Sequence, residues 1–141
     1  YDILEKKISK NIVKCGSLEE ILKISDIVVV CVKLNKKTNK MIGKKQFSMM
    51  KKNSFFINTS RGEVIDEKEL IKFLLNKRIK GAALDVISHE QTLDTSNNAL
   101  IQYSRKYNNL IITPHIAGST YESEEIAAEI AFENLKSVKI E

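Results

Sequence analysis

The chain has 141 residues, of which 43% are hydrophobic and 29% charged, and its formal net charge is +5. This length and composition suit one globular domain with a hydrophobic core. The longest apolar run, residues 27–32, is too short to cross a bilayer, and the paired lysines are not interleaved with aromatic residues, so we expect neither a membrane nor a nucleic-acid partner.

The two cysteines, Cys15 and Cys31, form no CxxC pair. This usage favours neither a metal site nor a disulfide framework, and it is typical of a chain that works in the reducing cytoplasm. The chain begins at Tyr1 rather than at methionine. That start indicates a fragment, a processed chain or an incomplete N-terminus, and the sequence leaves these three alternatives open.

Strand and helix patterns alternate in the first half of the chain. We expect the end of a strand at residues 1–3, a short strand at 12–13, a helix from 17, strands over 27–32 and 54–58, and a helix over 44–50 between them. Ser17 with Glu20 three residues later has the form of a capping box. Because residues 27–32 are apolar throughout, we expect a strand buried on both faces.

The alternation continues in the second half. Asp66 is expected to cap a helix that ends near Leu75, followed by a strand over 81–86, a helix over 100–106, a strand over 110–112 and a helix over 120–137. Gly118 frees the backbone before this last helix, and Ser119 or Thr120 caps it. The helix carries an apolar stripe made of Ile126, Ala127, Ile130, Ala131, Leu135 and Val138.

Strands that alternate with helices predict an α/β fold with a parallel sheet and right-handed crossovers. In such a sheet, the loops at the carboxyl ends of the strands form the binding site. Five chemically capable residues fall at these ends: Asp2, Arg61, Asp85, Glu90 and His115. Their coincidence at one edge is stronger evidence for a site than any one of them.

Three of these residues suit one reaction. An arginine holds a carboxylate through two parallel hydrogen bonds, which is the role expected for Arg61. A histidine gives or takes a proton near neutral pH, and a carboxylate beside it orients the ring and favours its charged form. Arg61, His115 and Glu90 together suit the interconversion of a 2-hydroxy acid and a 2-keto acid, and the hydride then needs a cofactor.

Each residue also has a purely structural interpretation. Arg61 suits an exposed turn, Glu90 a solvated loop and Asp2 a surface position. Asp85, at the end of a strand of small residues, suits the capping of backbone amides. His115 suits a satisfied histidine after the turn proline, an interpretation of at least equal weight when its own stretch is taken alone.

Four motifs carry a resemblance to a known family. They are SLEEIL (17–22) followed by DIVVVCV (26–32), INTSRG (57–62), GAALDV (81–86) and TPHIAGST (113–120). In their order and spacing, over nearly the whole chain, these motifs resemble the D-isomer-specific 2-hydroxyacid dehydrogenases, and four matches are far more specific than one. The resemblance implies a Rossmann-type, doubly wound parallel sheet.

The resemblance implies a catalytic trio of Arg61, Glu90 and His115 and NAD as the cofactor. The cofactor-binding residues that it implies are Asp2, Ile3, Val32, Thr59, Ser60, Arg61, Asp85, His115, Ala117 and Gly118. Asp2 matches the acid on the adenosine ribose, and a carboxylate there repels a 2′-phosphate, which favours NAD over NADP.

The implied partner is a small 2-hydroxy or 2-keto acid, and full-length members are usually homodimers. The Gly118-Ser119-Thr120 ending and the Tyr1-Asp2-Ile3 start, which other members share, favour members that act on 3-phosphoglycerate, and this implies serine biosynthesis.

Three departures from the family pattern stand out. Lys33 and Gln91 replace prolines, which adds a charge near the cofactor and loosens the loop of Glu90. Asp2 normally follows the start of a GxGxxG turn by about 20 residues, which places that turn and the first strand before position 1. We therefore expect residues 1–141 to form a partial NAD-binding domain, with the substrate domain mostly absent, that neither folds well nor turns over substrate alone.

A second hypothesis is a non-catalytic NAD-sensing module that binds a protein partner, because an intact catalytic trio does not exclude such a role. Tight NADH binding without turnover on any 2-keto acid would favour it. A basic nucleic-acid-binding domain is a third hypothesis, which predicts strongly salt-dependent binding.

Overall fold

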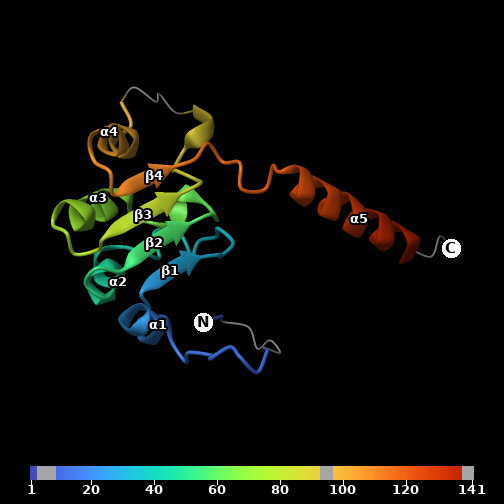
Figure 1. Ribbon diagram of the computed structural model, residues 1–141, viewed down its shortest axis with the longest axis horizontal. Helices are drawn as coiled ribbons and strands as arrows, with labels where there is room; N and C mark the ends of the chain where they lie inside the picture. Colours follow the sequence, from blue (N-terminus) through green and yellow to red (C-terminus); the bar gives the residue numbers. More distant parts are fainter. Residues whose placement is uncertain (3–8, 93–96, 138–141) are drawn as a thin grey trace.

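The computed structural model describes residues 1–2, 9–92 and 97–137, so Ile3 and Val138 lie outside the described residues. Helices and strands alternate along the chain (Figure 1). Their bounds are α1 (Leu18–Ile24), β1 (Ile27–Val30), α2 (Lys44–Met49), β2 (Phe55–Asn58), the 3₁₀ turn η1 (Gly62–Val64), α3 (Glu67–Leu75), β3 (Gly81–Leu84), the 3₁₀ turn η2 (Glu90–Thr92), α4 (Ala99–Lys106), β4 (Leu110–Ile112) and α5 (Tyr121–Ser137).

The four strands form one parallel sheet in the order β1-β2-β3-β4. Because neighbours in space are also neighbours in sequence, right-handed crossovers place every connecting helix on the same face. Helices α1 to α4 form a row along that face (Figure 1). The predicted α/β fold with a Rossmann-type parallel sheet is confirmed.

The hydrophobic core lies between the sheet and this row of helices. Phe47 of α2 meets Phe56 of β2 edge to face, with ring centroids 5.2 Å apart, and both side chains are buried. This geometry is the one that aromatic rings prefer. The other helices contribute their buried apolar residues to the same core, namely Leu22, Leu70, Leu74, Leu100 and Tyr103.

The opposite face of the sheet is open. Ile27 and Val29 are 56% and 53% exposed, whereas Val28 and Val30 are buried. The prediction that this strand is buried on both faces is therefore wrong, because no element of the described chain covers its second face. Phe55 of β2 and Ile111 of β4 continue the exposed apolar face.

Two short strands predicted near the amino end are not found. Tyr1 and Asp2 belong to no strand, and Ile12 and Val13 are exposed in irregular backbone. A strand requires a neighbour for its backbone hydrogen bonds, and β1 is the edge of the described sheet. In the described chain, nothing beyond β1 offers these residues a partner.

Three helices begin at side-chain caps that the sequence predicts. Ser17 and Asp66 each accept a hydrogen bond, at 3.1 Å, from the amide three residues further on. Thr120 Oγ1 accepts from the Ser123 amide at 3.2 Å, so Thr120 rather than Ser119 caps α5. These bonds satisfy amides that a helix start leaves without partners.

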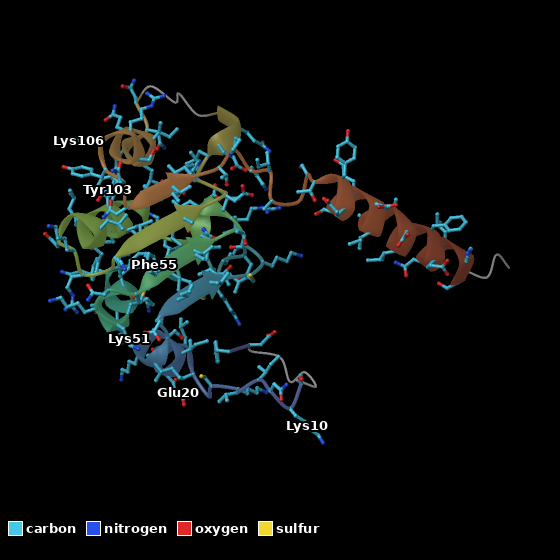
Figure 2. The ribbon with its side chains drawn as sticks, in the orientation of Figure 1. Lys10, Glu20, Lys51, Phe55, Tyr103 and Lys106 are labelled. Atoms are coloured by element: carbon cyan, nitrogen blue, oxygen red, sulfur yellow. The ribbon has the colours of Figure 1, made fainter. Side chains whose placement is uncertain are left out.

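Helix α5 projects from the body of the molecule (Figure 1), and its side chains point into open space along its length (Figure 2). Its stripe residues Ile126, Ile130 and Leu135 are 56%, 57% and 70% exposed. The predicted helix is confirmed. Its apolar stripe is exposed in the described residues and faces no core, because the described sheet ends at β4. No helix in the described ranges has the length and apolar character needed to span a membrane.

Candidate functional site

The carboxyl ends of β2, β3 and β4 lie at one edge of the sheet, because parallel strands end on the same side. Asn58 pairs with Leu84, and Leu84 pairs with Ile112, in the register of the three strands. The segments that follow these residues carry Arg61, Glu90 and His115. The fold therefore brings the three predicted catalytic segments to the same edge.

Buried Asn58 shapes the turn that carries Arg61. Its Oδ1 accepts hydrogen bonds from the amide of Ser60 at 3.0 Å and from its hydroxyl at 2.8 Å, and its Nδ2 donates to the Arg61 carbonyl at 2.9 Å. A buried amide side chain that satisfies its oxygen and nitrogen in this way fixes the local backbone. Asn58 thus makes the turn that presents Arg61 a rigid one.

Gly62 places this turn directly against the segment that leads to Glu90. A Cβ built on Gly62 would lie 2.0 Å from the carbonyl carbon of Ile87 and 2.1 Å from the amide nitrogen of Ser88. Only a residue without a side chain allows two backbone segments to come this close. The contact makes the Arg61 turn and the Glu90 segment direct neighbours.

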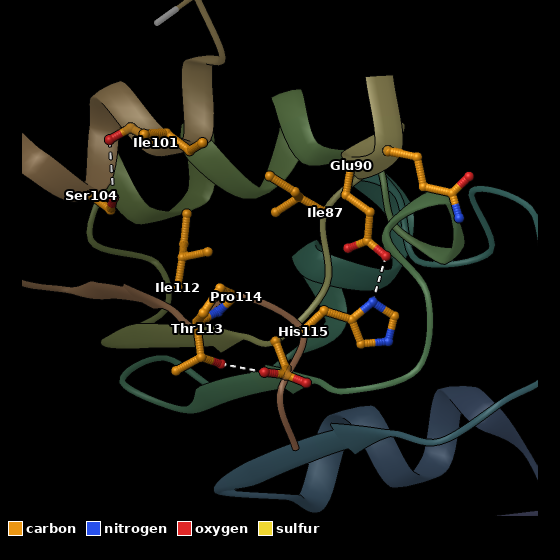
Figure 3. A pocket seen from close by; sticks show the side chains of 10 residues that line it. Ile87, Glu90, Ile101, Ser104, Ile112, Thr113, Pro114 and His115 are labelled. Atoms are coloured by element: carbon orange, nitrogen blue, oxygen red, sulfur yellow. Dashed lines mark hydrogen bonds and ion pairs between the residues drawn. The ribbon is translucent and has the colours of Figure 1, made fainter. Parts of the chain in front are cut away.

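His115 and Glu90 form the central pair of the site. His115 Nδ1 lies 2.5 Å from Glu90 Oε1 (Figure 3). Because a carboxylate only accepts hydrogen bonds, Nδ1 carries the proton and Nε2 is left for a substrate. The two side chains are 43% and 30% exposed, so the pair is accessible at the edge of the sheet.

The backbone around His115 is set by a tight turn. The His115 amide donates to the Thr113 carbonyl at 3.0 Å, which closes a three-residue turn around Pro114, and the fixed φ of proline suits that turn. His115 itself has a φ of 54°, a left-handed conformation that costs energy in a residue other than glycine. Pro114 and this strained backbone together direct the ring.

Asp85 fastens the segment that carries His115. It is 5% exposed, and its Oδ1 accepts from the Thr113 hydroxyl at 2.5 Å and from the Ile116 amide at 3.1 Å, while Oδ2 accepts from the Ala117 amide at 2.9 Å. Burial alone would raise the pKa of this carboxyl, but these hydrogen bonds outweigh it, so the pKa of Asp85 lies below its ordinary value.

Replacing Asp85 with asparagine is expected to lower the free energy of unfolding at pH 7 by about 2 kcal/mol, because the hydrogen bonds lose their charged acceptor. Since folding lowers the pKa of Asp85, its stabilisation is present above the ordinary carboxyl pKa of about 4 and is lost as the pH falls through the folded value. Urea unfolding at pH 7 and at pH 3 measures the difference, which should shrink at the lower pH.

Asp26→Asn is the matched control, because the Asp26 side chain is 82% exposed and pairs with Lys51 at the surface. Such pairs contribute at most about 1 kcal/mol. Equal losses of stability in the two variants at pH 7 would contradict the role given to Asp85.

Two cavities flank the Asp85–Thr113 pair, which lines both. The larger, of about 630 Å³, lies between α4 and the Glu90–His115 pair and is also lined by Ile101 (Figure 3).

The smaller cavity, of about 330 Å³, lies on the open face of the sheet, and Ile57, Ala83 and Ile111 form its floor. Thr59 and Ala117 are at its rim. An apolar floor with a few polar groups at the rim suits a flat ring such as nicotinamide.

The structure places the predicted cofactor-binding residues differently. Thr59, Asp85 and Ala117 line the smaller cavity, and Asp85 and His115 line the larger one. The Ser60 hydroxyl turns inward to Asn58.

The other predicted contacts lie outside both cavities. Asp2, Arg61 and Gly118 are exposed, and Val32 is half-buried. Gly118 lacks the positive φ that would require a glycine.

Arg61 is not joined to the Glu90–His115 pair in the described residues. Its guanidinium Nη1 donates to the Ser60 carbonyl at 2.6 Å, and in the described ranges no hydrogen bond links it to Glu90 or His115. An exposed guanidinium on a rigid turn remains accessible to a carboxylate ligand.

Sequence reasoning missed Asn58 and Thr113 as residues that shape the site. Each stands at the carboxyl end of an apolar strand, where a polar residue is buried or turned inward. A polar residue in that position is a usable signal, because buried polar groups require partners. The structural interpretation of Asp85 predicted from the sequence, the capping of backbone amides, is confirmed by the hydrogen bonds that it accepts from the Ile116 and Ala117 amides.

Comparison with known proteins assigns the family. Residues 1–117 match the family model described as D-isomer specific 2-hydroxyacid dehydrogenase, NAD binding domain. D-3-phosphoglycerate dehydrogenase of Escherichia coli (strain K12) is 37% identical over 96% of this chain and 33% of its own length, and glyoxylate reductase of Pyrococcus furiosus is 38% identical over 86% and 34%. The chain thus spans about a third of the length of these curated relatives.

Solved structures of members of the same family resemble this chain in fold. D-lactate dehydrogenase with NAD+ from Lactobacillus jensenii has a TM-score of 0.83 at 32% identity, covering 94% of this chain and 42% of that one. The NAD-complexed D-isomer specific 2-hydroxyacid dehydrogenase from Lactobacillus delbrueckii has a TM-score of 0.82 at 30% identity, covering 99% and 46%. The chain belongs to the D-isomer-specific 2-hydroxyacid dehydrogenase family and matches its NAD-binding domain.

Proposed function

We propose that the protein that carries this chain is an NAD-dependent oxidoreductase that interconverts a D-2-hydroxy acid and its 2-keto acid. The observation that carries the proposal is the Glu90–His115 pair, with His115 Nδ1 held by the carboxylate at 2.5 Å. This pairing leaves Nε2 to exchange a proton with the substrate oxygen. The family assignment supports the same reaction.

Each residue of the proposed trio has one task. NADH, when bound, supplies the hydride to the carbonyl carbon. His115 gives its Nε2 proton to the carbonyl oxygen during reduction and takes it back during oxidation. Glu90 orients the ring and stabilises its charged form, and Arg61 holds the substrate carboxylate through its planar fork.

In this proposal, residues at the carboxyl edge of the sheet would hold NAD. Thr59 and Ala117, at the rim of the smaller cavity, would contact the nicotinamide end, and the Asp2 carboxylate would accept hydrogen bonds from the adenosine ribose hydroxyls. Val32 and Gly118 remain predicted contacts. The chain would then be a partial NAD-binding domain, with the substrate domain elsewhere in the protein.

The proposed substrate is 3-phosphoglycerate. The phosphoglycerate dehydrogenase relative is 37% identical, but the glyoxylate reductase relative, at 38%, is as similar. Identity alone therefore does not choose between them, and the choice of 3-phosphoglycerate comes from the ending Gly118-Ser119-Thr120 together with the start Tyr1-Asp2-Ile3. With that substrate, the enzyme would serve serine biosynthesis as a cytoplasmic homodimer.

A panel of 2-keto acids with NADH tests the function. We expect the intact protein to oxidise NADH, followed at 340 nm (the absorbance of the reduced nicotinamide), with the keto acid of 3-phosphoglycerate preferred over glyoxylate and pyruvate. A preference for glyoxylate would correct the substrate but not the reaction. NADH binding without turnover on any keto acid would contradict the reaction and favour an NAD-sensing module.

A further inference from the structure

The segment that leads to Glu90 is fastened by two carboxylates from another part of the chain. The Ser88 amide donates to Glu67 Oε1 at 2.6 Å, and the His89 amide donates to Glu63 Oε1 at 3.1 Å. These donors are successive residues and stand directly before Glu90. Gly62 packs against the Ile87–Ser88 peptide in the same place, so three contacts join the two segments.

The Glu67 carboxylate is not needed to begin its helix. Glu67 is the first residue of α3, but the cap of that helix is already supplied by Asp66. Glu63 lies in the short turn η1. Burial alone would raise the pKa of Glu63, but hydrogen bonds from the His89 amide and from its own amide, together with the nearby charges of His89 and Arg61, outweigh it and keep that pKa below its ordinary value.

Ser88 and His89, which donate these bonds, lie outside the helices and strands. The residues before them, Asp85, Val86 and Ile87, are buried and belong to the body of the domain. His89 has a φ of 58°, a left-handed conformation that persists only where surrounding contacts impose it. Two hydrogen bonds to carboxylates, which are stronger than neutral ones, meet that requirement.

We propose that Glu63 and Glu67 are positioning residues that fix the Glu90 segment on the Arg61 turn, and so set the distance between Glu90 and His115. The proposal rests on the proposed dehydrogenase function. Neither residue touches the reacting atoms, and both act through Glu90. A misplacement of about 1 Å in such a pair is enough to cost activity.

The test uses the intact protein and two readouts. In Glu67→Ala, we expect kcat to fall about tenfold, with the KM for NADH unchanged, and the Ser88 amide to exchange its hydrogen faster. Glu67→Gln keeps an acceptor oxygen at the same length, and it should restore most of both losses. Glu69→Ala, on the same helix, is the matched control, because Glu69 pairs with Lys72 and should change neither readout.

A double-mutant cycle separates positioning from general destabilisation. If Glu67 acts through Glu90, Glu67→Ala should cost little further activity in a protein that already carries Glu90→Ala, which removes the side chain that Glu67 positions. Fully additive losses would overturn the positioning role, as would unchanged Ser88 exchange in Glu67→Ala.

Failure of the proposed dehydrogenase function can be distinguished from failure of the positioning role. If the unaltered protein turns over no keto acid, the dehydrogenase proposal falls, and Ser88 exchange alone then decides whether Glu67 fixes the segment. Faster exchange in Glu67→Ala with rescue by Glu67→Gln supports the fastening, and equal exchange in all variants overturns it.

Discussion

Replacing His115 with alanine is expected to lower kcat for keto-acid reduction by about 10²–10⁴-fold, the usual contribution of a positioned general acid or base. The variant removes the ring that Glu90 holds at 2.5 Å, so no group of the pair remains to protonate the carbonyl oxygen. Stopped-flow measurement of NADH oxidation, under saturating substrate, measures the loss on the chemical step.

Binding of NADH is the internal control for this variant. His115 lines the larger cavity and not the smaller one, where nicotinamide is proposed to lie. Its backbone is fixed by Asp85, so the side chain can be removed without releasing the segment. We therefore expect the Kd for NADH, from nicotinamide fluorescence, to change less than threefold, about 0.6 kcal/mol. A kcat within a factor of ten of the unaltered protein would remove His115 from proton transfer.

Glu90→Gln offers a graded comparison. Glutamine keeps an oxygen that accepts from Nδ1, so the ring stays oriented, but the negative charge that favours imidazolium is gone. We expect a smaller loss of kcat than in His115→Ala, and the same assay measures it. A loss equal to that of His115→Ala would make the charge of Glu90, rather than its hydrogen bond, the essential contribution.

Much of the fold and site follows from local sequence signals. The structure reproduces two local patterns that the sequence predicts: the alternation of strands and helices, and the helix caps at Ser17 and Asp66. Arg61, Glu90 and His115 could be assigned to one edge because parallel strands end together. The prediction that these residues share one edge required only the order and direction of the strands, and no knowledge of side-chain contacts.

The features that the sequence did not reveal depend on contacts between distant segments. Residues 27–32 are apolar throughout, and nothing in that run tells which face another element will cover. The bonds from Ser88 and His89 to Glu67 and Glu63 join residues 21 and 26 positions apart. Glutamates next to a turn are ordinary surface residues until the fold places amides beside them.

The second large effect is expected from Gly62→Ala. The added methyl would lie 2.0 Å from the Ile87 carbonyl carbon and 2.5 Å from its oxygen. These neighbours are backbone atoms of a buried residue, so no side chain can turn aside and the two segments must separate. Strain of this kind typically costs about 3 kcal/mol of stability, which urea unfolding of the intact protein measures.

Gly118→Ala is the matched control, because a Cβ on Gly118 would meet no atom within 4 Å and its φ is not positive. It should unfold within about 0.5 kcal/mol of the unaltered protein or be slightly more stable, since alanine restricts the unfolded chain. Gly62→Ala should also lower kcat, because the separation moves Glu90 and the Arg61 turn apart. Equal stability of Gly62→Ala and Gly118→Ala would contradict the close contact between the Arg61 turn and the segment that leads to Glu90. It would also remove the physical reason for placing Arg61 and Glu90 in one site.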